Sequence, residues 1–389
     1  MQYPPDRMVH DDEPMLISWE SMAWSAPRYS RSQVDAAGEY LICPRKPFDF
    51  LSDDEVHRFG RDDVMDIINN WRASHNLPLY VIRRTLENRA LRISPLSIIA
   101  QRIKRLPSIE VKLRQNQYRH LKLSKLQDIG GCRAIMPTIE DALALLKVYE
   151  KVRIGSELMR PRDYIANPKP DGYRSVHLIY KYHSDSARFA MFNNQRIEIQ
   201  IRSHLQHLWA TAVETVSTFS GLPLRQTSGS MLLRPKEYLI YWRRLFQLMG
   251  SAIAMREGQP IVPGTPSSRE ELVNELRSLD AELHVKNSLL AWTAVVSYLP
   301  KSPHAANAHL WLMKLIPEER RLEIESFREE LSEVAFNEYV SAEQPKRDAP
   351  STQVVLVSVA SLDALKKAYP NYYADTKAFA QVFDEAIKR

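Results

Sequence analysis

Residues 195–203 read Gln-Arg-Ile-Glu-Ile-Gln-Ile-Arg-Ser, with isoleucine at every second position and Glu198, Gln200 and Arg202 between them. Successive side chains of a strand point to opposite faces, so this stretch predicts a strand with one apolar and one polar face. Same-face residues lie roughly 6.5–7 Å apart, which places a carboxylate, an amide and a guanidinium in a row. The carboxylate can hold a cation or accept a proton, and the guanidinium can neutralise phosphate. A solvent-facing strand with mixed polar residues is the alternative interpretation of this stretch alone.

A second group of polar residues surrounds a glycine pair. Asp128 precedes Gly130 and Gly131, and Arg133 follows on a predicted strand. Two glycines allow the backbone to approach a ligand closely, although turns favour the same residues.

A third group follows the basic loop 160–172, in which prolines on both sides of Lys169 restrict its backbone. Tyr173, Ser175 and His177 alternate on the next predicted strand and therefore share a face. Such a row can stack on a base and hydrogen-bond to it. A buried structural pair of tyrosine and histidine is the competing interpretation.

The stretch from residue 81 to 125 contains twelve lysines or arginines and only two acidic residues. A solvated helix face normally mixes charges, so this bias indicates an anionic partner. Arg102, Lys104 and Lys112 are the candidates for a phosphate clamp. The alternative is a basic helix face that only keeps the protein soluble.

The chain has 389 residues, which predicts two or three domains, and a net charge of +6, which fits a nucleotide, RNA or an anionic membrane surface. Its two cysteines, Cys43 and Cys132, lack metal-ligand spacing, which favours a reducing compartment. No apolar run approaches the ~20 residues of a membrane span. A signal-peptide pattern is also absent from the N-terminus. We therefore expect a cytoplasmic protein.

Periodicity and turn signals divide the chain into an N-terminal arm (1–50), a first domain (51–257), a linker rich in Gly, Pro and Ser (258–268) and a small C-terminal domain (269–389). The predicted helices cover residues 51–75, 79–100 with an interruption at Pro95, 139–152, 235–257, 269–297 and 328–342, and a further helix is capped by Ser203. Strands are predicted in the C-terminal domain at 309–316, 321–327 and 353–359. The C-terminal domain shows no catalytic cluster.

Taken together, these motifs resemble the synthetase domain of the RelA/SpoT alarmone enzymes over roughly residues 30–255. The resemblance implies an α+β, nucleotidyltransferase-like fold in which helices flank a mixed sheet. It also implies transfer of the pyrophosphate of ATP to a 3′-hydroxyl. Asp128 and Glu198 would then hold Mg²⁺, and Glu198 would accept the proton of the attacking hydroxyl.

The same resemblance assigns the remaining residues. Arg102 and Arg133 are expected against the adenine, and Lys104 and Lys112 on the ATP phosphates. The residues expected around the acceptor are Lys169, Tyr173, Ser175, His177, Gln200 and Arg202. The chain departs from the Trp-Ala-x-x-Glu-His pattern of many stand-alone synthetases, because Glu214 is displaced by one position and the histidine is missing. This departure concerns the choice of acceptor rather than the use of ATP.

A Tyr-x-x-Tyr pair near the C-terminus, Tyr369 and Tyr372, is similar to a feature of the CapRel family of fused toxin–antitoxin proteins in phage defence. That resemblance implies that the C-terminal domain blocks the ATP site until a phage capsid protein binds it. It also implies that the acceptor is the 3′ CCA end of tRNA. The alternatives are GDP or GTP as acceptor, giving (p)ppGpp, and an inactive sensor module. Under the first hypothesis, removing the residues after 265 or replacing Tyr372 with Ala makes the protein toxic.

Overall fold

The computed structural model describes residues 24–43, 61–115, 121–151, 157–159, 161–220, 224, 236–293, 297–300, 308–316, 319–343, 352–359, 361–369 and 376–388. Most of the predicted N-terminal arm lies outside these residues. Its described part contains the helix α1 (Arg31–Ile42), which begins at a capping box formed by Ser30 and Gln33. Tyr372 also lies outside the described residues.

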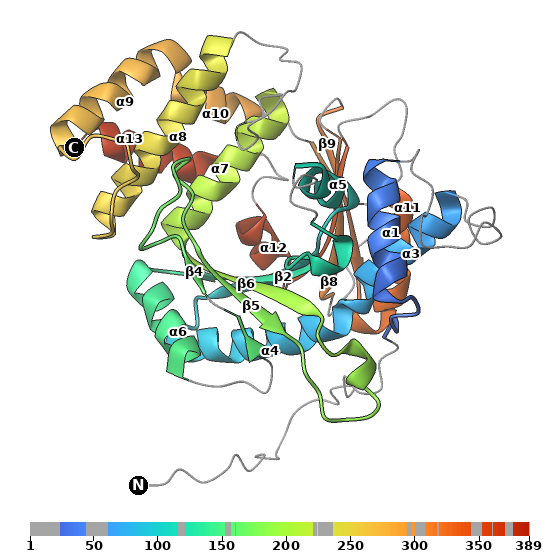
Figure 1. Cartoon of the computed structure of the whole chain (residues 1–389). Helices are drawn as coiled ribbons and strands as arrows, with labels where there is room; N and C mark the ends of the chain where they lie inside the picture. The colour runs from blue at the N-terminus through green and yellow to red at the C-terminus, as the bar shows by residue number, and fades with distance from the viewer. Residues whose placement is uncertain are drawn as a thin grey trace, which may run out of the picture.

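A mixed sheet organises the molecule (Figure 1). Within the described residues it has ten strands in the order β3-β5-β6-β2-β1-β10-β8-β9-β7, with β4 paired to β5. β2 and β6 are parallel, as are β7 and β9, and the other pairs are antiparallel. The strands are β1 (Ile98–Ile103), β2 (Gly130–Met136), β3 (Glu157–Leu158), β4 (Arg162–Asp163), β5 (Val176–Lys181), β6 (Arg196–Ser203), β7 (Ser297–Pro300), β8 (Leu310–Ile316), β9 (Arg321–Phe327) and β10 (Gln353–Ser358). The predicted α+β class and mixed sheet are confirmed.

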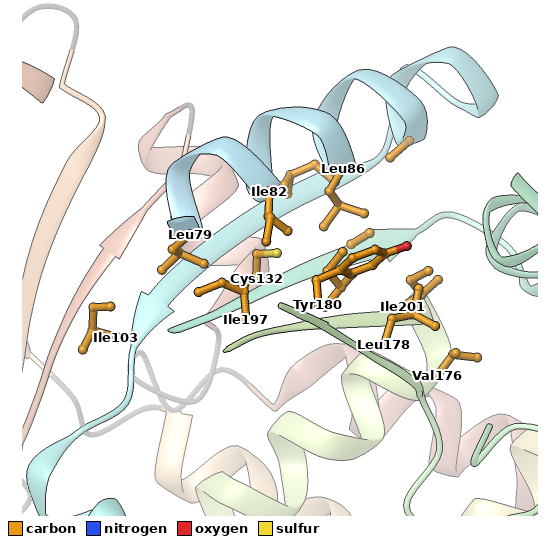
Figure 2. Close-up of a cluster of buried hydrophobic side chains, with 14 of the residues drawn as sticks. Leu79, Ile82, Leu86, Ile103, Cys132, Val176, Leu178, Tyr180, Ile197 and Ile201 are labelled. Carbon is orange, nitrogen blue, oxygen red and sulfur yellow. The ribbon is translucent and has the colours of Figure 1, made fainter. Parts of the chain in front are cut away.

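One face of the sheet is covered by α4 (Asn76–Ile93) and α6 (Ile139–Lys151). Figure 2 shows side chains of α4 packed on the strands. The three isoleucines of β6 are fully buried in this core. Burying an isoleucine side chain stabilises the fold by roughly 1.5–3 kcal/mol, which fixes the strand register. The polar residues between them must therefore point to the opposite face.

That opposite face is partly covered by α12 (Leu362–Ala368), which packs on β1. Ile99 and Ile103 of β1 belong to the α4 core, whereas Ala100 lies in the core beneath α12. The helix α11 (Ser332–Ala342) lies on the α4 side of the sheet, against β8 and β10.

Two helical groups flank the sheet. A cluster of five helices shares one apolar core: α7 (His204–Ser220), α8 (Lys236–Arg256), α9 (Arg269–Leu283), α10 (Val285–Thr293) and α13 (Lys377–Lys388). Near the other side, α1 packs with α3 (Arg61–Ser74), α5 (Leu106–Gln115) and the 3₁₀ turn Leu123–Lys125. In the described part of the chain, no helix has the length and apolar character that crossing a membrane requires.

The C-terminal strands continue the N-terminal sheet, because β10 pairs with β1 and residues Arg102 and Val357 lie opposite one another. The predicted linker 258–268 packs on α8: Val262 is fully buried, and Ser251 and Thr265 form a hydrogen bond of 2.6 Å. The domain boundary placed there stays a prediction.

Several predicted elements are confirmed closely, including the helices at 139–152 and 235–257, the helix capped by Ser203, and the three C-terminal strands. Two helix predictions are wrong in part. The helix predicted over 79–100 ends at Ile93, and β1 begins at Ile98, because the β-branched pair Ile98 and Ile99 packs in the sheet. The helix predicted over 269–297 breaks at His284, which adopts a left-handed conformation with φ 46°.

Candidate active site

Strand register brings the predicted site residues together. Gly131 of β2 lies between Arg102 of β1 and Glu198 of β6, and Arg133 lies opposite Gln200. A side chain built at Gly131 would meet only the backbone oxygen of Glu198, at 3.9 Å, so packing does not require a glycine there. The missing side chain instead leaves space between the arginine and the glutamate.

This space is a cavity of about 80 Å³ whose wall combines basic, acidic and aromatic side chains. Its lining residues are Ala100, Arg102, Lys104, Asp128, Gly131, Cys132, Arg133, Glu198, Gln200 and Tyr369. A larger cavity of about 280 Å³ lies between α8, α9 and α13, away from these groups. The polar cavity is small for a nucleotide because Tyr369 forms part of its wall.

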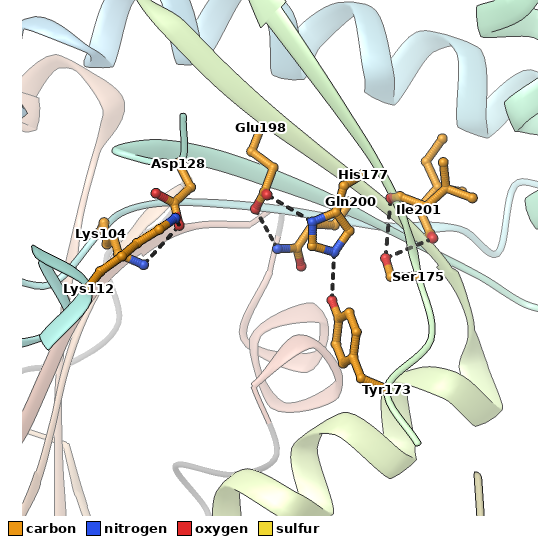
Figure 3. A network of polar contacts seen from close by, with 10 residues as sticks. Lys104, Lys112, Asp128, Tyr173, Ser175, His177, Glu198, Gln200 and Ile201 are labelled. Atoms are coloured by element: carbon orange, nitrogen blue, oxygen red, sulfur yellow. Dashed lines mark hydrogen bonds and ion pairs between the residues drawn. The ribbon is translucent and has the colours of Figure 1, made fainter. Parts of the chain in front are cut away.

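At one end of the cavity, Asp128 holds two lysines (Figure 3). Its Oδ2 accepts hydrogen bonds from Lys104 Nζ at 3.0 Å and Lys112 Nζ at 2.8 Å. Burial alone would raise the pKa of Asp128, but the two ammonium groups outweigh it and the pKa lies below its ordinary value. The other oxygen, Oδ1, is buried without a hydrogen-bond partner among the described residues. Asp128 is therefore ionised and has one oxygen available for a further ligand.

Beside it, Glu198 is the centre of a hydrogen-bonded chain (Figure 3). His177 Nδ1 lies 2.9 Å from Oε1, Gln200 Nε2 donates to Oε2 at 2.7 Å, and Tyr173 Oη lies 2.9 Å from His177 Nε2. Burial raises the pKa of Glu198, but the interactions with His177 and Gln200 outweigh it and leave the pKa below its ordinary value. Glu198 is thus an anion at neutral pH and is oriented on both oxygens.

At the other end, Arg133 and Tyr369 meet. The central guanidinium carbon of Arg133 lies 5.6 Å from the Tyr369 ring centroid, and Arg133 Nη1 donates to the carbonyl of Ala368 at 3.3 Å. His207 Nε2 donates to the carbonyl of Lys367 at 2.8 Å, and burial lowers the pKa of His207 well below its ordinary value. The last carbonyls of α12 are therefore held by two side chains from β2 and α7.

An aromatic wall lies next to His177. The ammonium nitrogen of Lys169 is 4.4 Å from the ring centroid of Tyr164 and 5.1 Å from that of Tyr173. Tyr164 and His177 meet edge to face at 5.2 Å. Sequence reasoning missed Tyr164; its only signal was an aromatic residue in the proline-containing loop that holds Lys169.

Two residues predicted around the acceptor are buried away from open space. Ser175 is fully buried and donates to the carbonyl of Ile201 at 3.0 Å, and Arg202 is only 3% exposed. In this conformation Ser175 presents no polar atom for an acceptor, and Arg202 is almost fully enclosed. Glu214, the displaced acidic residue of α7, lies close enough to Arg133 and Tyr369 to influence the pKa of both.

The carboxylates suit a small hard cation, because Mg²⁺ is bound through one or two carboxylates and completed by water and phosphate oxygens. Asp128 and Glu198 line the same cavity, and the unpartnered Oδ1 of Asp128 is a free hard oxygen. Among the described residues, no three or more His, Cys, Asp or Glu side chains are grouped so that they could hold a metal ion.

The part of the chain that carries most of this site is similar to a known protein family. Residues 101–219 match the family described as "Region found in RelA / SpoT proteins". GTP pyrophosphokinase YjbM of Bacillus subtilis (strain 168) is 31% identical over 129 residues, which are 33% of this chain and 60% of the relative. GTP pyrophosphokinase YwaC of the same organism is 36% identical over 89 residues, which are 22% of this chain and 40% of the relative. The chain thus spans less than two thirds of the length of either relative.

Among solved structures, the small alarmone synthetase 1 from Bacillus subtilis bound to its product pppGpp has 23% sequence identity. The alignment covers 47% of this chain and 89% of that chain, with a TM-score of 0.38. The matched region 101–219 contains both carboxylates and all the predicted basic site residues, whereas Tyr369 lies outside it.

Proposed function

We propose that the protein is an ATP-dependent pyrophosphokinase whose residues 101–219, which match the RelA/SpoT region, form the synthetase domain. The observation that carries the proposal is the convergence of Asp128, with its two lysines, and Glu198 in one cavity. Phosphoryl-group chemistry depends mainly on positioning and on neutralising charge, and this cavity offers the groups for both.

In the proposed reaction, the 3′-oxygen of the acceptor attacks the β-phosphorus of ATP. The bond from that phosphorus to the α,β-bridging oxygen breaks, and AMP leaves. Glu198 takes the proton of the attacking hydroxyl, and His177 and Gln200 hold its carboxylate in position. Lys104 and Lys112 neutralise the phosphate charge, while Arg102 and Arg133 contact the adenine.

Asp128 and Glu198 would hold Mg²⁺ together with the phosphates. The bound cation would supply charge neutralisation on the transferred group. The lysines that now contact Asp128 Oδ2 are placed so that they can turn to the phosphates once the nucleotide enters.

The acceptor is either the 3′ CCA end of tRNA or GDP or GTP. Support for tRNA comes from the basic stretch 81–125, because phosphate contacts provide most of the non-specific affinity for nucleic acids. The displaced acidic residue Glu214 also departs from the pattern of stand-alone synthetases. Support for a guanosine nucleotide comes from the relatives, which are named GTP pyrophosphokinases. We favour tRNA and keep the guanosine nucleotide as the second candidate.

The cavity also supports regulation by the C-terminal region. Tyr369 is 3% exposed and occupies the end of the cavity where the resemblance places adenine, beside Arg133. We propose that the chain is the autoinhibited toxin of a fused toxin–antitoxin system in phage defence. A phage capsid protein that binds the C-terminal region would release Tyr369 and allow translation to be blocked.

The test uses γ-labelled ATP with the full-length Tyr369→Ala protein, in which the cavity is open. Label should move to deacylated tRNA and not to tRNA whose terminal 3′-hydroxyl has been removed. Transfer only to GDP or GTP would select the second candidate. If neither acceptor is labelled while the protein is folded and binds ATP, the proposed enzyme is wrong and an inactive sensor module is favoured.

A further inference from the structure

A buried arginine links the C-terminal region to the back of the proposed ATP site. Arg72 of α3 has no exposed surface, and its Nη2 forms an ion pair with Glu343 at 2.7 Å. The same nitrogen donates to Tyr339 Oη at 2.8 Å, and Tyr339 Oη donates to Glu343 Oε1 at 2.8 Å. Tyr339 lies on α11 and Glu343 directly follows that helix. Residues separated by more than 260 positions in the chain thus form one closed polar cluster.

This cluster ends on the backbone of the segment that joins β1 to α5. Arg72 Nε donates to the carbonyl of Lys104 at 3.2 Å, and Glu343 Oε1 accepts from the amide of Leu106 at 2.9 Å. Leu106 is the first residue of α5, so the Glu343 carboxylate also lies at the positive end of the helix dipole. The segment is therefore held on both sides of Arg105.

The backbone groups bound by this cluster, the Lys104 carbonyl and the Leu106 amide, determine where the two lysines of the site lie. Lys104 directs its side chain at Asp128 while its carbonyl is bound by Arg72. Lys112 is carried by α5, whose first turn is fixed by Glu343. A buried ion pair is weak evidence for stability alone, since apolar residues often replace such pairs without loss. Its directional bonds, in contrast, define where the lysine-bearing backbone lies.

We propose that Arg72, Tyr339 and Glu343 are positioning residues for Lys104 and Lys112, so that the C-terminal region completes the ATP site as well as entering it through Tyr369. The proposal rests on the proposed function of this cavity. If the positioning role is correct, an activating partner must displace α12 and leave α11 in place. Deleting the whole C-terminal region would remove Tyr339 and Glu343 and would therefore disturb the ATP site.

The test compares three variants in the full-length Tyr369→Ala background. Glu343→Gln removes the countercharge of Arg72 but keeps an acceptor for the Leu106 amide. Arg72→Lys keeps the charge but loses the planar fork that reaches Lys104, Tyr339 and Glu343 together. Tyr339→Phe removes only the hydroxyl and is the mildest of the three. We expect the Kd for an unreactive α,β-methylene analogue of ATP to rise about tenfold or more in the first two variants and less in the third. The KM for the acceptor should not change.

Glu323→Gln is the matched control. Glu323 is also a shielded glutamate of the C-terminal region, with a side chain 14% exposed and an ion pair with Arg321 at 3.1 Å, but it lies on β9. This variant should change the Tm without changing the Kd for the analogue. The proposal is overturned if the cluster variants behave like this control, with a lower Tm but a Kd for the analogue within about twofold of the parent value. Tyr339→Phe decides the question if the stronger variants do not fold.

Binding of the analogue requires no turnover, so the two proposals fail separately. Normal analogue binding without any pyrophosphate transfer in the parent counts against the proposed function. Transfer by the parent together with unchanged ATP binding in the cluster variants counts against the positioning role.

Discussion

The guanidinium of Arg133 lies over the ring of Tyr369, with 5.6 Å between its central carbon and the ring centroid. An arginine next to an aromatic face is an attractive contact, worth about 0.5–2 kcal/mol depending on desolvation. Under the proposed function, an adenine ring would present a similar face to the same arginine. Tyr369 and the nucleotide would then compete for Arg133, and the C-terminal region would act on the site without carrying any catalytic group.

Replacing Tyr369 with Ala should open the adenine end of the cavity. The buried ring contributes roughly 3 kcal/mol to the docking of α12, so its loss shifts the population toward the open state. The affinity for the α,β-methylene analogue of ATP should rise about tenfold or more, as measured by equilibrium dialysis. Tyr369→Phe keeps the ring over Arg133 and should bind the analogue as the wild type does. Equal affinity in the alanine variant would show that Tyr369 does not control access.

Truncation after residue 265 should give a different result from the point variant. The deletion removes β10 from the edge of β1, Glu343 from Arg72, and the helices α9, α10 and α13 that share a core with α7. Breaking a buried ion pair by removing one partner costs about 3–5 kcal/mol, before the exposed apolar surface is counted. We expect loss of the cooperative thermal transition rather than a toxic enzyme. A truncated protein that melts cooperatively and transfers pyrophosphate would contradict this view.

Glu198→Gln should stop the reaction without unfolding the protein. The amide keeps the size of the side chain and can still accept a hydrogen bond, but it cannot take the proton and, being uncharged, is a weaker ligand for a cation. In the Tyr369→Ala background the initial rate should fall by roughly 10²–10⁴-fold, the usual contribution of a general base. The control is Glu157→Gln, because Glu157 is an exposed glutamate that pairs with Lys181. A rate close to that of the parent would remove Glu198 from the mechanism.

Much of the site could be predicted from local patterns. The alternation around Glu198 predicts both the strand and the face on which the carboxylate lies. The three isoleucines on one face pack in the same hydrophobic core, so the carboxylate must point to the other face. Asp128 was found through the glycine pair that follows it. In both cases the deciding forces act between neighbours in the sequence or across one sheet.

The remaining features depend on contacts that local patterns do not encode. Residues 98–103 begin with two adjacent isoleucines, a pattern that fits either a helix or a strand. Pairing with β2 makes this segment a strand, and that pairing cannot be read from the segment itself. Arg72 has the sequence context of an ordinary helix residue, and its partner Glu343 is more than 260 positions away. The pairing of β10 with β1 likewise has no signal in either strand alone.

The stability of the protein should fall on mild acidification because of a buried histidine. His75 is 1% exposed, its Nδ1 lies 2.7 Å from the carbonyl of Trp71, and burial lowers its pKa to about 4 from 6.5. The unfolded state therefore binds the proton more tightly than the folded state. Stability that is fully present above pH 6.5 is lost progressively as the pH falls toward 4. Between about pH 7 and about pH 4.5 the contribution of His75 amounts to about 2 kcal/mol.

His75→Gln isolates this contribution, because glutamine does not titrate and its amide can still donate to the Trp71 carbonyl. The pKa values of His204 and His207 are also lowered by burial, and both residues act in the same direction, but they are present in both proteins. The denaturant midpoint of the wild type should therefore fall more steeply with acidification than that of the variant. If the two proteins lose stability in parallel, His75 is either protonated in the folded state or reached by water, and the buried neutral imidazole inferred from its packing against Trp71 is wrong.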